Sequence, residues 1–385
     1  MHIAGPLALG CGITVAYTYM GYPLLLWLLV RLRERRIEQS QQTPPVTLLV
    51  SAFNEQAVIR SKIENCLALD YPRDNLELIV ISDASTDGTD QIVEEFAADQ
   101  VHLLRMPQRC GKTVGLNAAV QRAQGVIIAF SDANIMYQPD ALRCLVRNFA
   151  DLTVGCVTGD SRYIDPNQSA AHKLEETYWH YEQTLRTLES RFGSTVGGDG
   201  AIFAIRKELY TPLPPNAIND LVVPLQIVAR GYRAVFDPTA VGFEPTAGQF
   251  DGEFRRKRRI VNRSWQGIMS VSDVLKPWRV GTFAWQVWSH KVIRWLVLPV
   301  ILIGATACYF AEPLGMIYQL GFVGWVSSLI VAVCGALCSR RRGTAARFAH
   351  GVFYFYLVNV AASWGIVLAL RGHVETVWTP ERASK

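Results

Sequence analysis

The chain of 385 residues is long enough for a large domain, and 50% of its residues are hydrophobic while only 18% are charged. That charge content is low for a purely soluble protein and indicates membrane segments. The formal net charge of +5 comes largely from basic clusters beside apolar stretches. Anionic lipid head groups explain such clusters better than nucleic acid does, so no nucleic-acid partner is expected.

Four uncharged stretches are candidates for membrane helices, because a helix needs roughly 20 apolar residues to cross a bilayer core. They run from Ile3 to Val30, from Trp295 to Ala311, from Leu314 to Ser339 and from Phe348 to Leu370. The second is long enough if Ile293 and Arg294 lie at the interface. We therefore expect one membrane helix within residues 1–30 and three within 293–371, followed by a tail at 372–385.

Two basic clusters predict the orientation in the membrane. They are "RLRERR" at 31–36 and "SRRRGTAAR" at 339–347, and two crossings separate them. Positive residues favour the cytoplasmic side, so both clusters are expected inside, with the short link "EPLG" and both termini outside. The first stretch has no basic region before it, which favours a retained helix over a cleaved signal peptide. The sequence thus predicts a multi-pass protein of the cell membrane whose main domain is cytoplasmic.

Between the membrane stretches, residues 46–270 alternate strand-like runs with helical patterns. This alternation is typical of an α/β domain with a parallel or mixed sheet. A basic linker at 31–45 precedes the domain, and an interfacial amphipathic segment at 271–292 follows it. The runs are "VTLLVSAF", "LELIVISD", "VHLLRM", "VIIAFSD" and "VGCVTGD"; the helices expected between them are Ala57 to Leu69, Asp87 to Ala98, Val114 to Ala123 and Pro139 to Phe149.

Polar side chains follow three of these runs where each strand ends. They are Asn54 and Glu55 after the first run, Asp83 after the second, and Asp132 and Asn134 after the fourth. An isolated Asp is also common in ordinary turns. Ligands of parallel sheets bind beyond the carboxyl ends of the strands, however, and three such ends would form one acidic rim. Oxygen ligands of this kind suit Mg²⁺ or Mn²⁺ completed by substrate phosphates.

The segment "RCGKT" at 109–113 looks like the end of a phosphate-binding P-loop. That pattern requires a glycine five residues before Gly111, and Met106 stands there instead. No Gly-x-Gly-x-x-Gly follows the first run either, which disfavours a dinucleotide-binding domain. Lys112 is then either a phosphate-binding charge at the start of a helix or a surface lysine.

Several motifs give a specific resemblance. The motifs "VSAFNE", "VISDASTDGT", "GKTVGLNAA" and "FSDAN" are followed by "GGDGAIFAIRKEL" at 197–209, "INDLVVPLQIVARGYRAVFDP" at 218–238 and "EFRRKRRIVNRSWQG" at 253–267. Together they resemble the family 2 inverting glycosyltransferases over about 46–267. This resemblance implies a Rossmann-like GT-A domain and a nucleotide-sugar donor, with a UDP-sugar expected. The flanking helices resemble the polysaccharide-synthase branch, which includes hyaluronan, chitin and cellulose synthases.

The resemblance also implies roles for the strand-end residues. Asn54, Glu55 and Asp83 would hold the base and ribose of the donor, and Lys112 would lie near the diphosphate. Asp132 and Asn134 would form the metal motif. The family usually has a second Asp in this motif, so the neutral Asn134 leaves Asp132 to carry most of the binding of Mg²⁺ or Mn²⁺.

By the same resemblance, Asp220 in "IND" would be the general base that takes the proton of the acceptor hydroxyl. Its alternative role is to cap a helix that begins at Leu221, and the two roles are compatible. Asp199 in "GGDGA" would lie in the acceptor pocket, and a tight structural turn is the alternative there.

The synthase motif Gln-x-x-Arg-Trp is only partly present near the end of the domain. Arg263 aligns with its arginine, Trp265 falls one place late, and Ile260 replaces the glutamine. We assign Arg259, Arg263 and Trp265 to the catalytic region, where the arginines would stabilise the leaving diphosphate. The alternative is an amphipathic helix face that touches lipid head groups.

These observations predict a membrane-bound inverting glycosyltransferase that extends a growing polysaccharide through a β-linkage. Transfer of one sugar to a lipid, such as a polyprenyl phosphate or diacylglycerol, is the alternative. A catalytically inactive membrane scaffold that senses nucleotide sugars is the alternative of another class. The polar His350 and Asn359 in the fourth stretch suit a polar path or an interhelical hydrogen bond. Four helices are few for a pore, so a partner subunit or a second copy is a further expectation.

Overall fold

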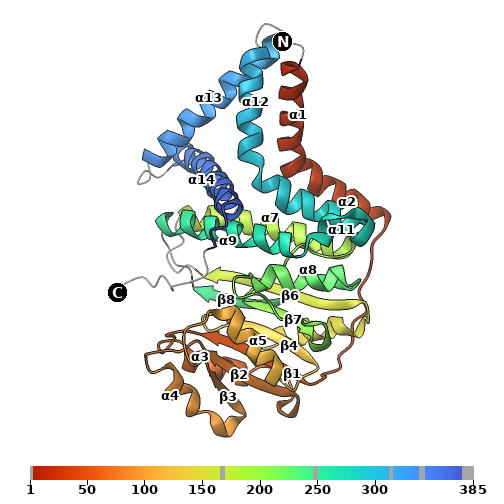
Figure 1. The fold of residues 1–385 in the computed structure, drawn as a ribbon, viewed down its shortest axis with the longest axis vertical. Coiled ribbons are helices and arrows are strands. Elements are labelled where there is room, and N and C mark those ends of the chain that lie inside the picture. Colours follow the sequence, from red (N-terminus) through yellow and green to blue (C-terminus); the bar gives the residue numbers. More distant parts are fainter. Residues whose placement is uncertain (1–2, 165–169, 246–249, 312–314, 338–342, 375–385) are drawn as a thin grey trace.

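The domain is built on one mixed sheet of eight strands (Figure 1). The computed structural model describes residues 3–164, 170–245, 250–311, 315–337 and 343–374. The strand order in the sheet is β3-β2-β1-β4-β7-β6-β8-β5. The strands are β1 (Val46–Ala52), β2 (Leu76–Ser82), β3 (Val101–Arg105), β4 (Ile127–Asp132), β5 (Met136–Tyr137), β6 (Val154–Ile164), β7 (Ile202–Arg206) and β8 (Arg233–Pro245).

The pairing of the strands confirms the predicted α/β class. Strands β3, β2, β1 and β4 pair in parallel, while β7 is antiparallel to both of its neighbours, β4 and β6. Each of the five predicted runs forms a strand. The prediction did not include β5, β7 or β8. The sequence of β8 contains Asp237 and Pro238, two residue types that strands usually avoid, and this hides it from a reading of pattern alone.

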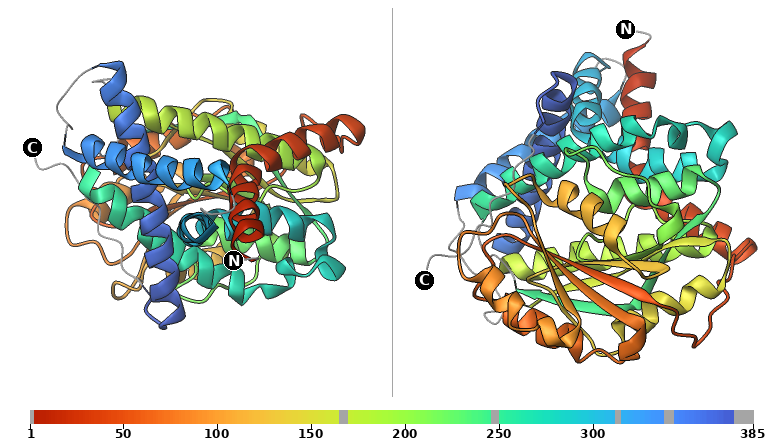
Figure 2. Two further views of the ribbon diagram at one scale, coloured as in Figure 1. Left: turned by 90° about the horizontal axis from the view of Figure 1, so that it is seen from above. Right: turned by 60° about the horizontal axis from the view of Figure 1, so that its bottom comes forward.

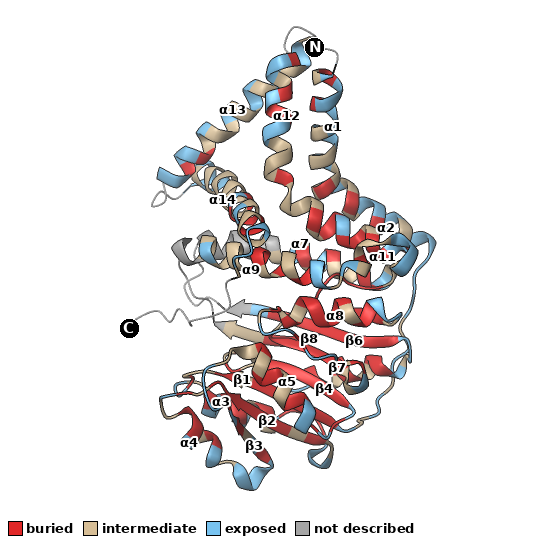
Figure 3. Cartoon of the chain, in the orientation of Figure 1, coloured by how far each residue is buried: buried red, intermediate tan, exposed pale blue. Residues whose placement is uncertain are grey.

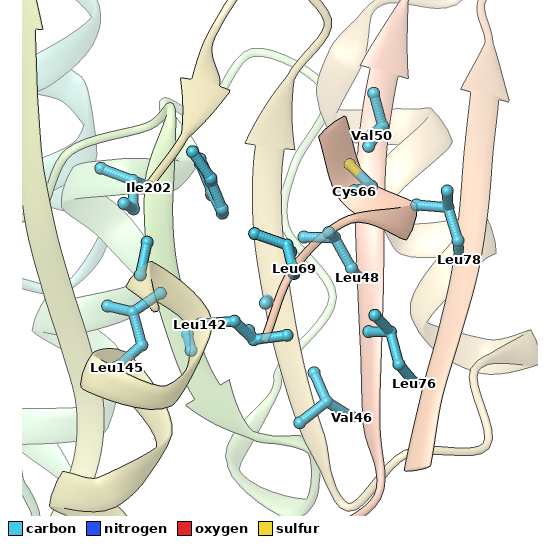
Figure 4. Close-up of a cluster of buried hydrophobic side chains, with 14 of the residues drawn as sticks. Val46, Leu48, Val50, Cys66, Leu69, Leu76, Leu78, Leu142, Leu145 and Ile202 are labelled. Atoms are coloured by element: carbon cyan, nitrogen blue, oxygen red, sulfur yellow. The ribbon is translucent and has the colours of Figure 1, made fainter. Parts of the chain in front are cut away.

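Helices bury an apolar core on each face of the sheet. On one face, α3 (Ile59–Leu67) and α6 (Ala141–Val146) pack against side chains such as Leu48 (Figure 4). On the other face, α5 (Lys112–Arg122) and α8 (Asn219–Ala229) do the same. The helices α3, α6 and α4 (Thr89–Glu94) are shorter than predicted, and α5 begins two residues earlier than predicted.

A layer of helices lies between the sheet and the most apolar helices (Figure 1). It consists of α2 (Tyr22–Leu32), α7 (Ala170–Phe192), α9 (Phe250–Ser270) and α11 (Thr282–Val287). The segment 271–292 was predicted to lie at the membrane surface and forms short helices, among them α10 (Pro277–Val280) and the π-helical turn Trp288–Ile293. Val274, Phe283 and Val287 of this segment are buried in the core beside α8, whereas Trp278 is 79% exposed.

Three helices are long and apolar enough to cross a membrane. They are Ala4–Leu32, which joins α1 (Ala4–Ala16) to α2, then α13 (Met316–Leu337) and α14 (Thr344–Leu370). A fourth span results if Thr282–Ile293 and α12 (Val297–Ala311), which meet at a bend of 69°, are counted as one. The predicted number of four agrees with this upper count. Many side chains of these helices are exposed (Figure 3), as lipid-facing residues would be.

The apolar helices gather on one side of the domain, and the N-terminus lies at their far end (Figures 1 and 2). α1 and α12 pack closely: a Cβ added to Gly304 of α12 would lie only 2.8 Å from the Cβ of Cys11 on α1. Most of the link "EPLG", residues 339–342 of the second basic cluster and most of the tail lie outside the described residues. Their predicted orientation stays a prediction.

Candidate active site

The carboxyl ends of β1, β2 and β4 meet at one edge of the sheet, because these strands are neighbours and run in parallel. A cavity of about 1220 Å³ opens at this edge. Its lining includes every predicted site residue except Asn54 and Trp265, namely Glu55, Asp83, Lys112, Asp132, Asn134, Asp199, Asp220, Arg259 and Arg263. The fold thus brings together residues that are far apart in the sequence, as the predicted acidic rim at the strand ends requires.

Asn54 lies in the turn after β1 with a positive φ of 54°. Its side-chain oxygen accepts a hydrogen bond of 2.8 Å from the backbone N–H of Thr86, and its own N–H donates to Ser85 Oγ at 3.1 Å. Asparagine tolerates this left-handed backbone better than most residues. In the structure, Asn54 therefore joins the loops after β1 and β2.

Asp83 holds the loop that precedes α5. Its carboxylate accepts hydrogen bonds from the backbone N–H of Cys110, at 2.7 Å, and of Gly111, at 2.9 Å. Gly111 has a φ of 88°, a conformation that favours glycine, and the next residue begins α5. Asp83 thereby fixes the start of the helix from which Lys112 enters the cavity.

Lys112 contacts the predicted metal motif directly. Its ammonium group donates hydrogen bonds to Asp132 Oδ1 and, at 3.2 Å, to the carbonyl of Gly200. This places a cation beside the carboxylate at the end of β4, where a donor diphosphate would need positive charge. Lys112 therefore lines the cavity, and its role in phosphate binding stays a prediction.

Asn134 is oriented by a residue that the sequence analysis did not identify. Its amide nitrogen donates a hydrogen bond of 2.7 Å to Glu244 Oε1 on β8, which directs the amide oxygen away from Glu244. Burial, together with the nearby charges of Asp132 and Asp199, raises the pKa of Glu244 to about 7. Glu244 had no detectable signal in the sequence, because the strand that carries it was not predicted.

The residues at this edge fit a hard divalent cation. Asp132 supplies a carboxylate and Asn134 an amide oxygen, the donor types that Mg²⁺ and Mn²⁺ prefer. Among the described residues, no group of three His, Cys, Asp or Glu side chains is placed to hold a metal ion. An ion bound by Asp132 and Asn134 would therefore complete its coordination with phosphate oxygens and water.

Asp220 lies in the first turn of α8, whose N-cap residue is Ile218. The prediction that Asp220 caps a helix beginning at Leu221 is wrong, because the helix begins at Asn219 and has no side-chain cap. Asp220 Oδ1 is buried and has no hydrogen-bond partner among the described residues. Burial raises the pKa of Asp220, and the charges of Asp199 and Asp132 add to this while Lys112 and Arg263 oppose it.

The turn "GGDG" at 197–200 packs against the start of α8. Asp199 Oδ1 accepts from the N–H of Ala201 at 3.1 Å, and Ser161 Oγ donates to Asp199 Oδ2 at 2.6 Å. A Cβ on Gly200 would lie 3.0 Å from Asp220 Oδ2. Asp199 thus stabilises a tight turn and also lines the cavity. Its role in the acceptor pocket stays a prediction.

α9 carries the predicted arginines along one side of the cavity. Arg263 donates to the carbonyls of Asn216, at 3.2 Å, and Ala217, at 2.7 Å, just before α8. Trp265 lies outside the cavity lining, where its ring faces that of Trp295 with centroids 6.5 Å apart. The structure therefore places the two arginines at the site and Trp265 in the packing between helices.

α9 is held in place by the candidate membrane helix α14. A Cβ on Gly365 of α14 would lie 2.6 Å from the carbonyl oxygen of Arg258, and Asn262 donates to the carbonyl of Gly365 at 3.2 Å. The arginines of the site therefore depend on a close backbone contact with a helix that the sequence assigns to the membrane.

Gly365→Ala is expected to lower the stability of the protein by about 1–3 kcal/mol, the usual cost of overpacking, and to lower transfer activity because α9 shifts. Thermal unfolding in detergent and initial rates measure the two effects. Gly324→Ala on α13 is the matched control, because nothing lies within 4 Å of a Cβ there. Equal behaviour of the two variants would contradict the proposed coupling of α14 to the site.

An α/β sheet of this order, with an acidic cavity at its parallel strand ends, defines a GT-A domain of the nucleotide-sugar transferase type. Residues 47–212 match the family model described as glycosyl transferase family 2. Residues 47–212 are therefore similar to the family 2 glycosyltransferases, and candidate membrane helices lie on either side of them.

Curated relatives agree with this class. A probable glycosyltransferase of Bacillus subtilis is 28% identical over 240 residues, which cover 58% of this chain and 56% of the relative. A beta-monoglucosyldiacylglycerol synthase of Nostoc is 35% identical over 144 residues, 36% and 31% of the two chains. A poly-beta-1,6-N-acetyl-D-glucosamine synthase of Staphylococcus aureus is 24% identical over 203 residues, 51% and 48%. The matches span about half or less of each of these relatives.

A solved structure matches nearly the whole chain. The mannosyltransferase of Pyrobaculum calidifontis, solved in complex with GDP-mannose and Mn²⁺, is 26% identical and has a TM-score of 0.66. The match covers 93% of this chain and 99% of the mannosyltransferase. The likeness therefore extends beyond the family 2 domain to the flanking helices.

Proposed function

We propose that this protein is a membrane-bound inverting glycosyltransferase that moves a sugar from a nucleotide-sugar donor to a lipid acceptor. The observation that carries the proposal is one continuous cavity. The same cavity is lined by Asp83, Asp132 and Asp220 and by residues of the candidate membrane helix α14. A donor from the cytoplasm and an acceptor from the bilayer can reach each other there.

The chemistry follows from the charged groups in the cavity. The acceptor hydroxyl forms a bond to the anomeric carbon as the bond from that carbon to the diphosphate oxygen breaks, and Asp220 takes the hydroxyl proton. Lys112, Arg259 and Arg263 line the same cavity and stabilise the negative charge of the departing nucleoside diphosphate. Attack from the side opposite the leaving group inverts the configuration.

Asp132 and Asn134 would hold a divalent ion, which when bound supplies further positive charge to the donor phosphates. The solved mannosyltransferase was in complex with Mn²⁺, which supports Mn²⁺ or Mg²⁺ as the ion here. The oxygen donors at the end of β4 support the same assignment.

The lining of the cavity favours a lipid over a soluble acceptor. Gly351, Tyr354, Phe355 and Val358 of α14 contribute to the wall, and Tyr19 contributes from the first candidate span. Tyr19 and Phe355 stand with their ring centroids 5.8 Å apart. Val358 and the aromatic rings of this set offer apolar surface to an acceptor tail that remains in the bilayer.

A growing polysaccharide, the acceptor predicted from the sequence, is the second candidate. It is supported by the match to the poly-beta-1,6-N-acetyl-D-glucosamine synthase, whereas the match to the beta-monoglucosyldiacylglycerol synthase supports a lipid. Product length at low enzyme and excess donor separates the two. One sugar per lipid supports the lipid acceptor, and long chains beside untouched acceptor support the polymer.

The activity is tested by incubating the purified protein and Mn²⁺ or Mg²⁺ in lipid bilayers with a panel of UDP- and GDP-sugars. We expect release of nucleoside diphosphate from one donor, with transfer of the sugar to lipid. The panel includes both nucleotides, because the sequence resemblance implies UDP while the solved relative bound GDP-mannose. Donor binding without turnover of any donor would instead support an inactive nucleotide-sugar sensor.

The pH profile should report Asp220, which must be ionised to accept a proton. Its pKa is raised by burial, so the base is lost as the pH falls through a value above the aspartate reference of about 3.9. We expect kcat/KM for transfer to fall on the acidic side at that higher pH. Asp220→Asn should remove this part of the profile, and an unchanged acidic limb in the variant would assign it to another group.

A further inference from the structure

The cavity is larger than a single small-molecule site needs. Its volume of about 1220 Å³ exceeds the roughly 300–1,000 Å³ that encloses most small ligands. Its lining includes three further cations, Arg186 of α7, Lys291 of the turn Trp288–Ile293, and Arg294 at the bend before α12. None of these side chains has a role in the proposed chemistry so far.

Part of this positive charge is neutralised by buried carboxylates. Arg294 pairs with Glu182, and His290 lies between Glu182, at 3.2 Å, and Glu189, at 2.7 Å. Burial works against ionisation of Glu182, but Arg294 and His290 hold its pKa well below the usual value. Tyr22 donates a hydrogen bond of 2.5 Å to Glu189. This network joins α2 to α7 and accounts for Arg294 and His290.

The other two cations are not accounted for in the same way. The Arg186 side chain is only 12% exposed and makes no hydrogen bond within the described part of the chain. It forms a long ion pair with Asp199 Oδ2, at 3.9 Å, and its guanidinium lies 5.3 Å from the centroid of the Trp179 ring. Lys291 Nζ lies 3.4 Å from His290 Nε2 and forms no ion pair with any described residue, although the charges of Glu182 and Glu189 act on it from a longer distance. Buried cations whose N–H groups lack hydrogen-bond acceptors are costly. We therefore expect the part of the cavity beside Arg186 and Lys291 to bind an anion.

We propose that Arg186 and Lys291 bind a phosphate group of the acceptor lipid. The inference rests on the proposed function and makes it more specific, because it excludes an uncharged lipid head group such as that of diacylglycerol. The phosphate lies beside the hydroxyl that receives the sugar, and the lipid tail runs along α14.

The positions of the residues fit such an acceptor. Arg186 lies 3.9 Å from Asp199, and the neighbouring Gly200 packs against the carboxylate of Asp220. A phosphate held by Arg186 therefore brings an adjacent hydroxyl near the base. In transfer, this hydroxyl loses its proton to Asp220 and forms the new bond, the diphosphate leaves with the bonding electrons, and the lipid phosphate is unchanged.

The test uses acceptor pairs of which one member carries phosphate and the other is neutral. The first pair is phosphatidylglycerol and diacylglycerol with the same acyl chains. The second is decyl diphosphate-linked N-acetylglucosamine and decyl N-acetylglucosaminide. The assay uses the whole chain and the donor that the nucleotide-sugar panel identifies. We expect the phosphate member of at least one pair to be used about ten times faster than its neutral partner, since hydrogen bonds to a charged group commonly change a rate or affinity by about this factor.

Lys291→Met and Arg186→Gln should each raise the KM for the phosphate acceptor about tenfold or more and leave the KM for the donor unchanged. Lys276→Met is the matched control, because Lys276 lies outside the cavity lining and pairs with the exposed Asp273. An unchanged KM for the donor also shows that each variant is folded. The two variants lie on different helices, so a local folding defect at one position would not explain the same result at both.

Three results would overturn the inference. Equal use of the neutral and phosphate members would remove the anion site and leave the proposed lipid glycosyltransferase intact. Equal losses with both members in Lys291→Met and Arg186→Gln would assign these residues to packing. Release of nucleoside diphosphate without transfer to any of the four lipids would contradict the proposed lipid acceptor itself.

Discussion

Asp220→Asn is expected to lower sugar transfer by roughly 10² to 10⁴, the usual contribution of a general base, while donor binding persists. Asparagine keeps the size of the side chain but cannot take the proton of the acceptor hydroxyl. Asp220 Oδ1 has no hydrogen-bond partner within the described residues, so the substitution breaks no bond of that oxygen. Initial rates at saturating donor and calorimetric donor affinity measure the two effects separately.

Asp273→Asn provides the control for this variant. Asp273 has 49% of its side chain exposed and lies outside the cavity lining, so its loss should change neither transfer nor donor binding. Unchanged turnover in Asp220→Asn would leave Asp220 as a structural residue of the first turn of α8. Another group would then have to serve as the base.

Asp132→Ala is expected to abolish metal-dependent donor binding. Loss of residues that merely support metal ligands typically costs 10- to 100-fold in affinity, so loss of a ligand should cost at least about 10²-fold. Asn134 is neutral, and Lys112 would lose the carboxylate that it contacts. Calorimetric titration of the donor, with and without Mn²⁺, measures the metal-dependent part of the donor affinity.

A chelator added to the wild-type protein should reproduce the loss seen in Asp132→Ala, and it should have no further effect on the variant. If the variant keeps both its donor affinity and its dependence on Mn²⁺, the assignment of Asp132 to the metal is wrong. A loss of donor affinity that is the same with and without metal would indicate that Asp132 acts through Lys112 alone.

The location of the site could be predicted because it depends on local patterns. Each parallel strand is a short apolar run, and the first polar residues after it must lie at one edge of the sheet. Asp83 and Asp132 therefore line the same cavity, although 48 residues separate them in sequence. The site role of Asp220 could be predicted only from the resemblance to a family, because no local sequence pattern indicates that α8 lies at that edge of the sheet.

Other features could not be predicted, because they arise from packing between distant segments. Glu244 reaches Asn134 only through β8, a strand whose sequence does not look like one. His290 lies between two glutamates of α7, and only their spacing of seven residues hints that they share a helix face. The bend of 69° before α12 leaves Lys291 and Arg294 beside the cavity, whereas the sequence suggested only a membrane boundary.

The configuration of the product tests the central claim most directly. The purified protein is incubated in lipid bilayers with Mn²⁺ and an α-linked nucleotide sugar that it turns over, and the one-bond C1–H1 coupling of the transferred sugar is measured by NMR. The account predicts a β-linked sugar on the lipid, formed in a single inversion at the anomeric carbon with Asp220 as the base. An α-linked product would contradict it.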